Sequence, residues 1–215
     1  MNVNVVGLDM SLTSPAACVK LPDGSCKLAC FAQRQTDFAV DSGQPGIQIT
    51  VLPRIPSSAT SSDMQRYKHI VTYLTKFMFD NECASSTRVL VEGYAFPVAS
   101  MAGSTYKLHE LTGIMKYEIL RNFGIAAETV GVGTWKKLSV GNGHATKHDV
   151  VRRVRALTGV DMMTTFGKSL QDGPHAIPCP IQDLCDAYCI AFSADVVVAP
   201  PRTDSRKKRK RNEKD

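Results

Sequence analysis

The sequence predicts an α/β fold around a mixed sheet, and three observations support this prediction. Two short apolar stretches, residues 3–9 and 88–92, each end in an acidic residue and are typical of buried strands. Residues 16–21 and 27–33 have strand-like patterns on either side of a Pro-Asp-Gly-Ser turn, which predicts an antiparallel meander. Helical patterns alternate with the later strands, which is typical of α/β proteins.

The expected elements follow this order along the chain. The predicted strands are residues 3–9, 16–21, 27–33, 47–52, 88–92 and 125–130. The predicted helices are residues 63–81, 104–123, 146–157 and 181–198. The predicted loops are residues 34–62 (apart from the strand at 47–52), 93–103, 131–145 and 159–180. Gly, Ser, Thr and Pro are frequent in several of these loops, and residues 131–145 contain four glycines.

Residues at the ends and on the inner faces of the helices support their assignment. Asp63 is the expected cap of the first helix, whose apolar residues recur at helical spacing. These residues are Met64, Tyr67, Val71, Leu74 and Met78. Gly124 ends the second helix, and Gly113 within it would allow a close approach by a neighbouring element. Pro200 and Pro201 end the last helix.

Length and composition indicate one globular domain that stays inside the cell. The chain has 215 residues, of which 43% are hydrophobic, and this is enough for one sizeable core. No apolar run approaches the roughly 18–20 residues of a membrane span. The first residues lack the profile of a signal or transit peptide. The 7 cysteines are odd in number and have no C-x-x-C spacing, so we expect buried, reduced thiols.

Most of the net charge of +6 lies at the C-terminal end of the sequence. Residues 202–215 contain eight Lys or Arg and three Asp or Glu, so five of the six net positive charges fall there. We therefore predict a domain at residues 1–200 and a basic, disordered tail at residues 201–215. The tail would serve as a nuclear-import signal, a DNA-binding arm or a solubilising segment. The first role would place the protein in a nucleus, whereas the second is compatible with a phage or viral replication site.

Four acidic residues are candidates for a metal site. Asp183 and Asp186 are three residues apart in a predicted helix, so they share one face, and residues 182–192 contain no Lys or Arg to neutralise them. They could instead be acids of a first helical turn, which the helix dipole favours. Asp9 and Glu92 end two apolar strands, and if these strands are parallel neighbours the two carboxylates lie side by side.

Four carboxylates without a nearby His or Cys favour Mg²⁺ or Mn²⁺ as the bound cation. Two such ions about 4 Å apart can activate water on one side of a phosphodiester and stabilise the leaving oxygen on the other. The segment at residues 131–145, which combines glycines with lysines, could hold phosphates. Arg152 and Arg153 lie on a basic helix whose face is either solvated or in contact with a DNA backbone.

The ordered set of these motifs resembles the RuvC-type Holliday-junction resolvases of the ribonuclease H-like superfamily, including their phage and viral relatives. The matching pieces are Val5-Val6-Gly7-Leu8-Asp9, Val89-Leu90-Val91-Glu92-Gly93-Tyr94-Ala95-Phe96, Lys107-Leu108 with Gly113, Trp135 to Lys147, and Asp183-Leu184-Cys185-Asp186-Ala187. The resemblance covers about residues 3–195. The segment from Trp135 to Lys147 and the D-x-x-D-A motif are its most specific parts.

This resemblance implies a ribonuclease H-like fold and an enzyme that makes paired, symmetric nicks in four-way DNA junctions. Asp9, Glu92, Asp183 and Asp186 would bind two Mg²⁺ ions, for which Mn²⁺ would substitute. Lys136 and Lys147 would lie near the scissile phosphate and offset the charge that develops there. Members of this family are homodimers, so we expect a two-fold protein on a two-fold substrate. The resemblance implies no nucleotide cofactor.

Some residues depart from the pattern of the family. Met10-Ser11 follows the first acid, whereas many bacterial members have Pro-Gly. The base-stacking aromatic of the family falls on Ala95, so Tyr94 or Phe96 would take its place, and Lys137 is a further candidate DNA contact. Two alternatives stay open: a related nuclease that acts on RNA–DNA hybrids or flaps, and a non-catalytic junction-binding protein. A kinase-like nucleotide binder would need a longer chain.

Overall fold

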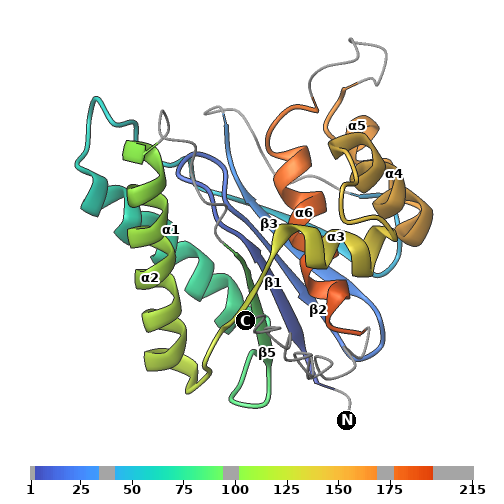
Figure 1. Ribbon diagram of the computed structural model, residues 1–215, viewed down its shortest axis with the longest axis horizontal. Helices are drawn as coiled ribbons and strands as arrows, with labels where there is room; N and C mark the ends of the chain where they lie inside the picture. Colours follow the sequence, from blue (N-terminus) through green and yellow to red (C-terminus); the bar gives the residue numbers. More distant parts are fainter. Residues whose placement is uncertain (1–2, 34–41, 94–101, 169–176, 196–215) are drawn as a thin grey trace, which may run out of the picture.

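A computed structural model of the protein describes residues 3–33, 42–93, 102–168 and 177–195. These residues form three layers, with a central sheet between two groups of helices (Figure 1). The first group is α1 (Asp63–Asp80) and α2 (Ala102–Phe123). The second group is α3 (Val132–Val140), α4 (Lys147–Thr158), α5 (Met162–Thr165) and α6 (Ile181–Ser193). The two groups enclose two separate hydrophobic cores, one on each face of the sheet.

The sheet within the described residues has six strands and is mixed, as predicted. The strands are β1 (Val5–Asp9), β2 (Ala16–Lys20), β3 (Cys26–Phe31), β4 (Ile47–Leu52), β5 (Arg88–Glu92) and β6 (Glu128–Val130), in the order β4-β3-β2-β1-β5-β6. β1, β2 and β3 form the expected antiparallel meander, and the other neighbours are parallel. The expected parallel pairing of β1 with β5 is confirmed.

The alternation of side chains along β1 and β5 determines which core each residue joins. Val6 and Leu8 of β1 belong to the core under α1 and α2. Val5 of β1 and Leu90 of β5 belong to the core under α6. Because side chains alternate with a period of two, Asp9 and Glu92 project toward the same face as Val5 and Leu90. Both acids are therefore directed toward the α6 layer.

The helix caps agree with the sequence except at one position. Ser62, rather than the predicted Asp63, caps α1, and its side chain accepts from the backbone N–H of Gln65 in a capping box. Thr146 caps α4 in the same way, with Asp149 as its partner. A serine hydroxyl is as good a cap acceptor as a carboxylate. Asp63 is thus the first helical residue rather than the cap.

Two predicted loops contain helices. Residues 131–145 include α3, because Val132 and Trp135 pack into the core and Gly141 adopts a left-handed conformation that ends the helix there. Residues 159–180 include the short helix α5, which the Asp161 side chain caps. In both segments, burial of apolar side chains outweighs the turn-forming composition.

Smaller differences concern the lengths of elements and one glycine. β6 covers only residues 128–130 of the predicted strand at 125–130, and α6 ends at Ser193 rather than at residue 198. Among the described residues, nothing lies within 4 Å of a Cβ added at Gly113, so they do not make the expected close approach there.

All seven cysteines are free thiols, and six of them are buried as expected, whereas Cys179 is exposed. Within the described part of the chain, no helix has the length and apolar character needed to cross a membrane. The predicted basic tail lies outside the described residues.

Candidate active site

Four acids from three elements interact with one another at one end of the sheet. Asp9 ends β1, Glu92 ends the neighbouring strand β5, and Asp183 and Asp186 come from the first two turns of α6. Asp9, Asp183 and Asp186 are only 6–8% exposed. The negative charges of the other three acids all act on Asp9 and raise its pKa. We call this set the carboxylate cluster; it brings together the four acids that the sequence singled out.

Burial and mutual repulsion make the charged form of the cluster costly. Burial is the largest cause of the raised pKa of each of its four acids. For Asp186, burial and then the charge of Glu92 raise the pKa to about 7. The Gln182 amide, 3.3 Å from Asp186 Oδ2, opposes this shift. A side-chain hydrogen bond between Asp9 and Glu92 raises the pKa of Asp9 and lowers that of Glu92.

The four acids lie near one another, but their oxygens do not surround a common point. Across the described ranges, no three His, Cys, Asp or Glu side chains are grouped closely enough to hold a metal ion. The donors nevertheless fit Mg²⁺ or Mn²⁺ chemically, because all four are carboxylates. In addition, Asp183 Oδ2 is buried and has no hydrogen-bond partner among the described residues. A buried oxygen of this kind needs a partner, and a cation would supply one.

Two lysines act on the cluster from different elements. Lys136 of α3 lowers the pKa of both Glu92 and Asp186, and its Nζ donates to the Ala145 carbonyl at 2.9 Å. Lys147, the first residue of α4, lowers the pKa of Asp183. The fold therefore places both predicted lysines next to the acids, each beside a different member of the cluster.

Sequence reasoning missed the polar groups that hold the acids in place. The Trp135 indole donates to Glu92 Oε1 at 3.1 Å. Polar contacts from the Ser14 hydroxyl and the Cys179 thiol lower the pKa of Asp183. The role of Trp135 was missed because the glycines around it predicted a loop where the structure has a helix. Ser14 is far from Asp183 in sequence, so only the fold brings the two together. Cys179 lies just before α6, in a segment that was predicted as a loop.

The predicted DNA-contacting residues differ in how free their side chains are. Lys137 is exposed on α3. Arg152 is largely exposed but pairs with Asp149 at 2.7 Å. Arg153 Nε donates to the Ser139 carbonyl at 2.9 Å, so this residue ties α4 to α3 as well as facing solvent. Tyr94 and Phe96 lie outside the described residues.

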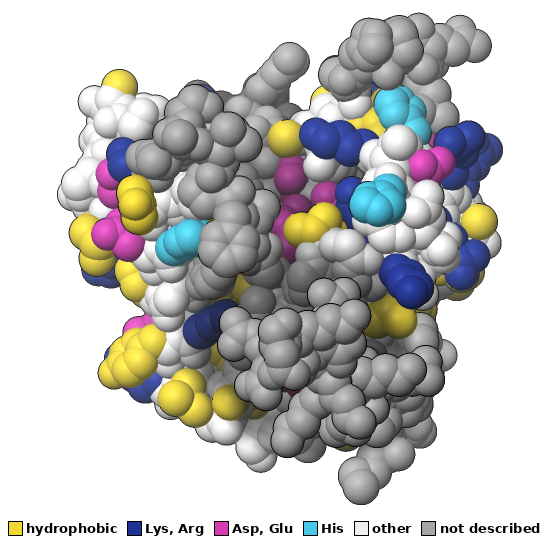
Figure 2. All heavy atoms as spheres, viewed as in Figure 1, with side chains coloured by type: hydrophobic (Ala, Val, Ile, Leu, Met, Phe, Trp, Pro, Cys, Tyr) yellow, Lys and Arg dark blue, Asp and Glu magenta, His cyan; other side chains and the backbone are white. Residues whose placement is uncertain are grey.

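One face of the molecule combines acidic and basic side chains. In Figure 2, acidic side chains lie near the middle of the view, and Lys and Arg side chains gather to their right, on the side where Figure 1 shows α4 and α5. A basic surface beside a buried cluster of acids suits a polyanion whose phosphate is brought to the acids.

Comparison with solved structures identifies the fold. The Thermus thermophilus RuvC structure has a TM-score of 0.50 and 17% sequence identity, with 89% of this chain and 92% of that chain covered. T. thermophilus RuvC in complex with Holliday junction substrate has a TM-score of 0.52, with the same identity and coverage. The chain has the fold of RuvC. The predicted ribonuclease H-like class, with a mixed sheet between helices, is thereby confirmed.

Weaker comparisons add nothing to the RuvC fold assignment. The yeast mitochondrial Holliday junction resolvase Ydc2 has a TM-score of 0.47 and 14% identity, with 89% of this chain and 77% of that chain covered, and this likeness carries no argument. No family model matches the sequence, and no curated protein matches it either. At 17% identity, RuvC shows the fold alone, so activity must be argued from the carboxylate cluster and its surroundings.

Proposed function

We propose that the protein is a metal-dependent endonuclease that resolves four-way DNA junctions by paired, symmetric nicks. The observation that carries this proposal is the carboxylate cluster, which lies beyond the carboxyl ends of two parallel strands with a lysine beside it on each of two further helices. The RuvC fold supports the choice of reaction class, and the solved complex of T. thermophilus RuvC with a Holliday junction substrate supports the choice of substrate.

The chemistry of the proposed site follows from its donors. Bound Mg²⁺ or Mn²⁺, two ions in our proposal, would activate water and stabilise the leaving oxygen of the phosphodiester. Asp9, Glu92, Asp183 and Asp186 would hold these ions. Lys136 and Lys147 would face the scissile phosphate and offset the negative charge that develops during cleavage. Lys137, Arg152 and Arg153, with Tyr94 or Phe96 stacking on a base, would hold the rest of the DNA.

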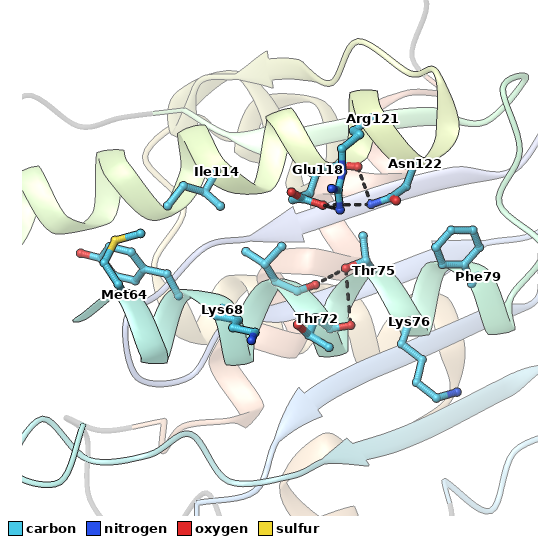
Figure 3. A pocket seen from close by; sticks show the side chains of 12 residues that line it. Met64, Lys68, Thr72, Thr75, Lys76, Phe79, Ile114, Glu118, Arg121 and Asn122 are labelled. Atoms are coloured by element: carbon cyan, nitrogen blue, oxygen red, sulfur yellow. Dashed lines mark hydrogen bonds and ion pairs between the residues drawn. The ribbon is translucent and has the colours of Figure 1, made fainter. Parts of the chain in front are cut away.

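A groove on the opposite side of the sheet supports a homodimer. Residues of α1 and α2 line a groove of about 540 Å³, and Figure 3 shows their side chains facing each other across it. Its walls carry Met64 and Phe79, which are 62% and 53% exposed. Tyr117 and Leu120 are also exposed apolar residues of α2. Exposed apolar side chains next to an apolar groove on one face are the elements of a self-complementary two-fold contact.

A substitution within the groove tests this interface. Met64 lines the groove and is exposed, so Met64→Asp should give a monomer in light scattering. Leu157→Asp, at an exposed leucine of α4, is the matched control and should leave the dimer intact. A monomeric unmodified protein would contradict this interface.

The basic tail has two proposed roles with separable tests. As a DNA arm, it would neutralise phosphates, so deleting residues 202–215 should weaken junction binding and reduce its dependence on salt. As a nuclear-import signal, it would leave both quantities unchanged and instead move a fluorescent fusion protein into nuclei.

Cleavage of a synthetic immobile four-way junction tests the proposed activity. The protein is incubated with the junction in Mg²⁺ or Mn²⁺, with linear duplex, flap DNA and RNA–DNA hybrid as controls. Paired, symmetric nicks in the junction alone are expected. Cleavage of the hybrid or flap alone would favour a related nuclease instead. Junction binding without cleavage in either metal would indicate a non-catalytic junction-binding protein.

A further inference from the structure

Trp135 is a buried side chain whose single polar group donates a hydrogen bond to the carboxylate cluster. It lies in α3, is 0% exposed and belongs to the core under α6. Its Nε1–H donates to Glu92 Oε1 at 3.1 Å. A buried indole needs an acceptor, and here the acceptor is one of the four acids proposed to bind metal rather than a backbone carbonyl.

This hydrogen bond fixes the orientation of Glu92. The indole ring is packed on all sides, so its N–H has one position, and the carboxylate oxygen that accepts from it is held there. The donor is neutral at every working pH and favours the charged form of Glu92. Glu92 Oε1 is therefore held in place by the Trp135 indole.

Helix α3 supplies a second group at the next position. Lys136 Nζ lies 5.6 Å from the centre of the Trp135 ring and also acts on Glu92. One turn of this helix thus brings a neutral donor and a positive charge to the same acid. Polar groups that orient a metal ligand from behind commonly change metal affinity by about 10- to 100-fold when they are removed.

We propose that Trp135 is a positioning residue that holds Glu92 ready for cation binding, and that its indole reports the binding of the cation. This inference rests on the proposed metal-dependent function. Because the sequence contains a single tryptophan, all tryptophan emission of the protein comes from the side chain that touches the cluster. Cation binding at Glu92 changes the acceptor of the indole N–H, so emission should change as the site fills.

Direct measurement of Mn²⁺ binding tests the positioning role without any reaction. Free Mn²⁺ is followed by electron paramagnetic resonance in the full-length protein without DNA. Trp135→Phe keeps a ring but loses the N–H, and it should raise the Kd for Mn²⁺ about tenfold or more. Ser139→Ala is the matched control, since Ser139 lies one turn further along α3, is also buried and donates to the Cys189 carbonyl rather than to one of the four acids. It should leave the Kd unchanged.

A second measurement uses the unmodified protein, so it does not depend on the folding of a variant. Mg²⁺ should change the tryptophan emission of the wild type to saturation. Equal Mn²⁺ affinity in wild type and a folded Trp135→Phe would overturn the proposal, as would bound Mn²⁺ without any change in wild-type emission. Weaker Mn²⁺ binding in Trp135→Phe but not in Ser139→Ala would support the positioning role of Trp135. If the same protein cut no junction, the proposed nuclease activity would be overturned while the role of Trp135 stood. Absence of Mn²⁺ binding in the wild type would overturn both.

Discussion

Gly7 in β1 lies directly against Ala187 in α6, since a Cβ at position 7 would be 2.3 Å from the Ala187 carbonyl oxygen. It would also be 2.4 Å from the backbone nitrogen of Ala191. Any side chain at this position would push the backbone of α6 away from the sheet. Asp183 lies one turn before Ala187 on the same helix, and Asp9 lies two residues after Gly7 on the same strand. The Gly7 contact therefore sets how near α6 carries its acids to Asp9.

Gly7→Ala should lower both stability and cleavage. Overpacking against helix backbone costs about 1–3 kcal/mol, and displacement of α6 moves Asp183 and Asp186 away from Asp9. Denaturant unfolding measures the first effect, and junction cleavage measures the second. Gly113→Ala is the matched control, because no atom of the described residues lies within 4 Å of its added Cβ in the middle of α2. That control should raise stability by about 0.5–1 kcal/mol and leave cleavage unchanged. A Gly7→Ala protein with unaltered stability and cleavage would contradict this account of the α6 contact.

Asp9→Asn should abolish cleavage while leaving junction binding largely intact. Asp9 is the acid on which the charges of the other three all act, and asparagine has almost the same shape without the charge. Loss of a direct ligand should exceed the roughly 10- to 100-fold loss typical of a group that only orients a ligand. Cleavage rates and junction binding are measured side by side, with thermal unfolding as a check of the fold. Full residual cleavage would contradict the assignment of Asp9 as a metal ligand. Loss of folding would also count against it, because the substitution would then act on stability.

Asp186→Asn should stabilise the cation-free protein at and above neutral pH. Burial and the charge of Glu92 raise the pKa of Asp186 to about 7, so the folded protein holds this proton more tightly than the unfolded chain does. The stability linked to this proton is fully present below about pH 4, the usual range of Asp, and is lost as pH rises through 7. The substitution should therefore add roughly 1–3 kcal/mol at pH 8 and little at pH 4.

Denaturant unfolding in a chelator, measured from pH 4 to 8, checks this prediction. Asp149→Asn provides a contrast, because bonds from Thr146 lower the pKa of Asp149. The contribution of Asp149 should stay nearly constant between pH 8 and pH 4, because its lowered pKa lies below that range. If Asp186→Asn changed the stability equally at pH 4 and pH 8, ionisation of Asp186 would not destabilise the folded protein, and this prediction would be wrong.

The sequence was sufficient to find the acids because their elements are regular. Strands that end in Asp9 and Glu92 are apolar and short, and the pair Asp183 and Asp186 has helical spacing. Period-two alternation then places both strand acids on one face. What the sequence could not show is the distance between layers, which depends on the absent side chain of Gly7 and on the alanines opposite it.

The region of α3 shows the opposite case. Gly131, Gly133, Gly141 and Gly143 predicted a loop, yet burial of Trp135 against α6 makes part of it a helix. Local composition is a weak signal where a large side chain enters the core. The resemblance to RuvC-type resolvases implied Lys136 as a site residue, but nothing in the sequence pointed to the tryptophan beside it, which contacts Glu92.

Lys136→Met should slow cleavage, whereas Lys137→Met should act only on binding. Lys136 acts on Glu92 and Asp186 and would offset charge at the scissile phosphate, so its loss should lower the cleavage rate by roughly 10²- to 10³-fold. Lys137 is exposed on the same helix, and as a phosphate contact its loss should lower the salt slope of junction binding by about one. The two substitutions remove the same charge and leave a stem of similar length, so they differ mainly in position. Single-turnover cleavage at saturating protein separates rate from binding. Equal slowing by both variants would mean that the basic surface as a whole, rather than the position of Lys136 beside the cluster, supports the reaction.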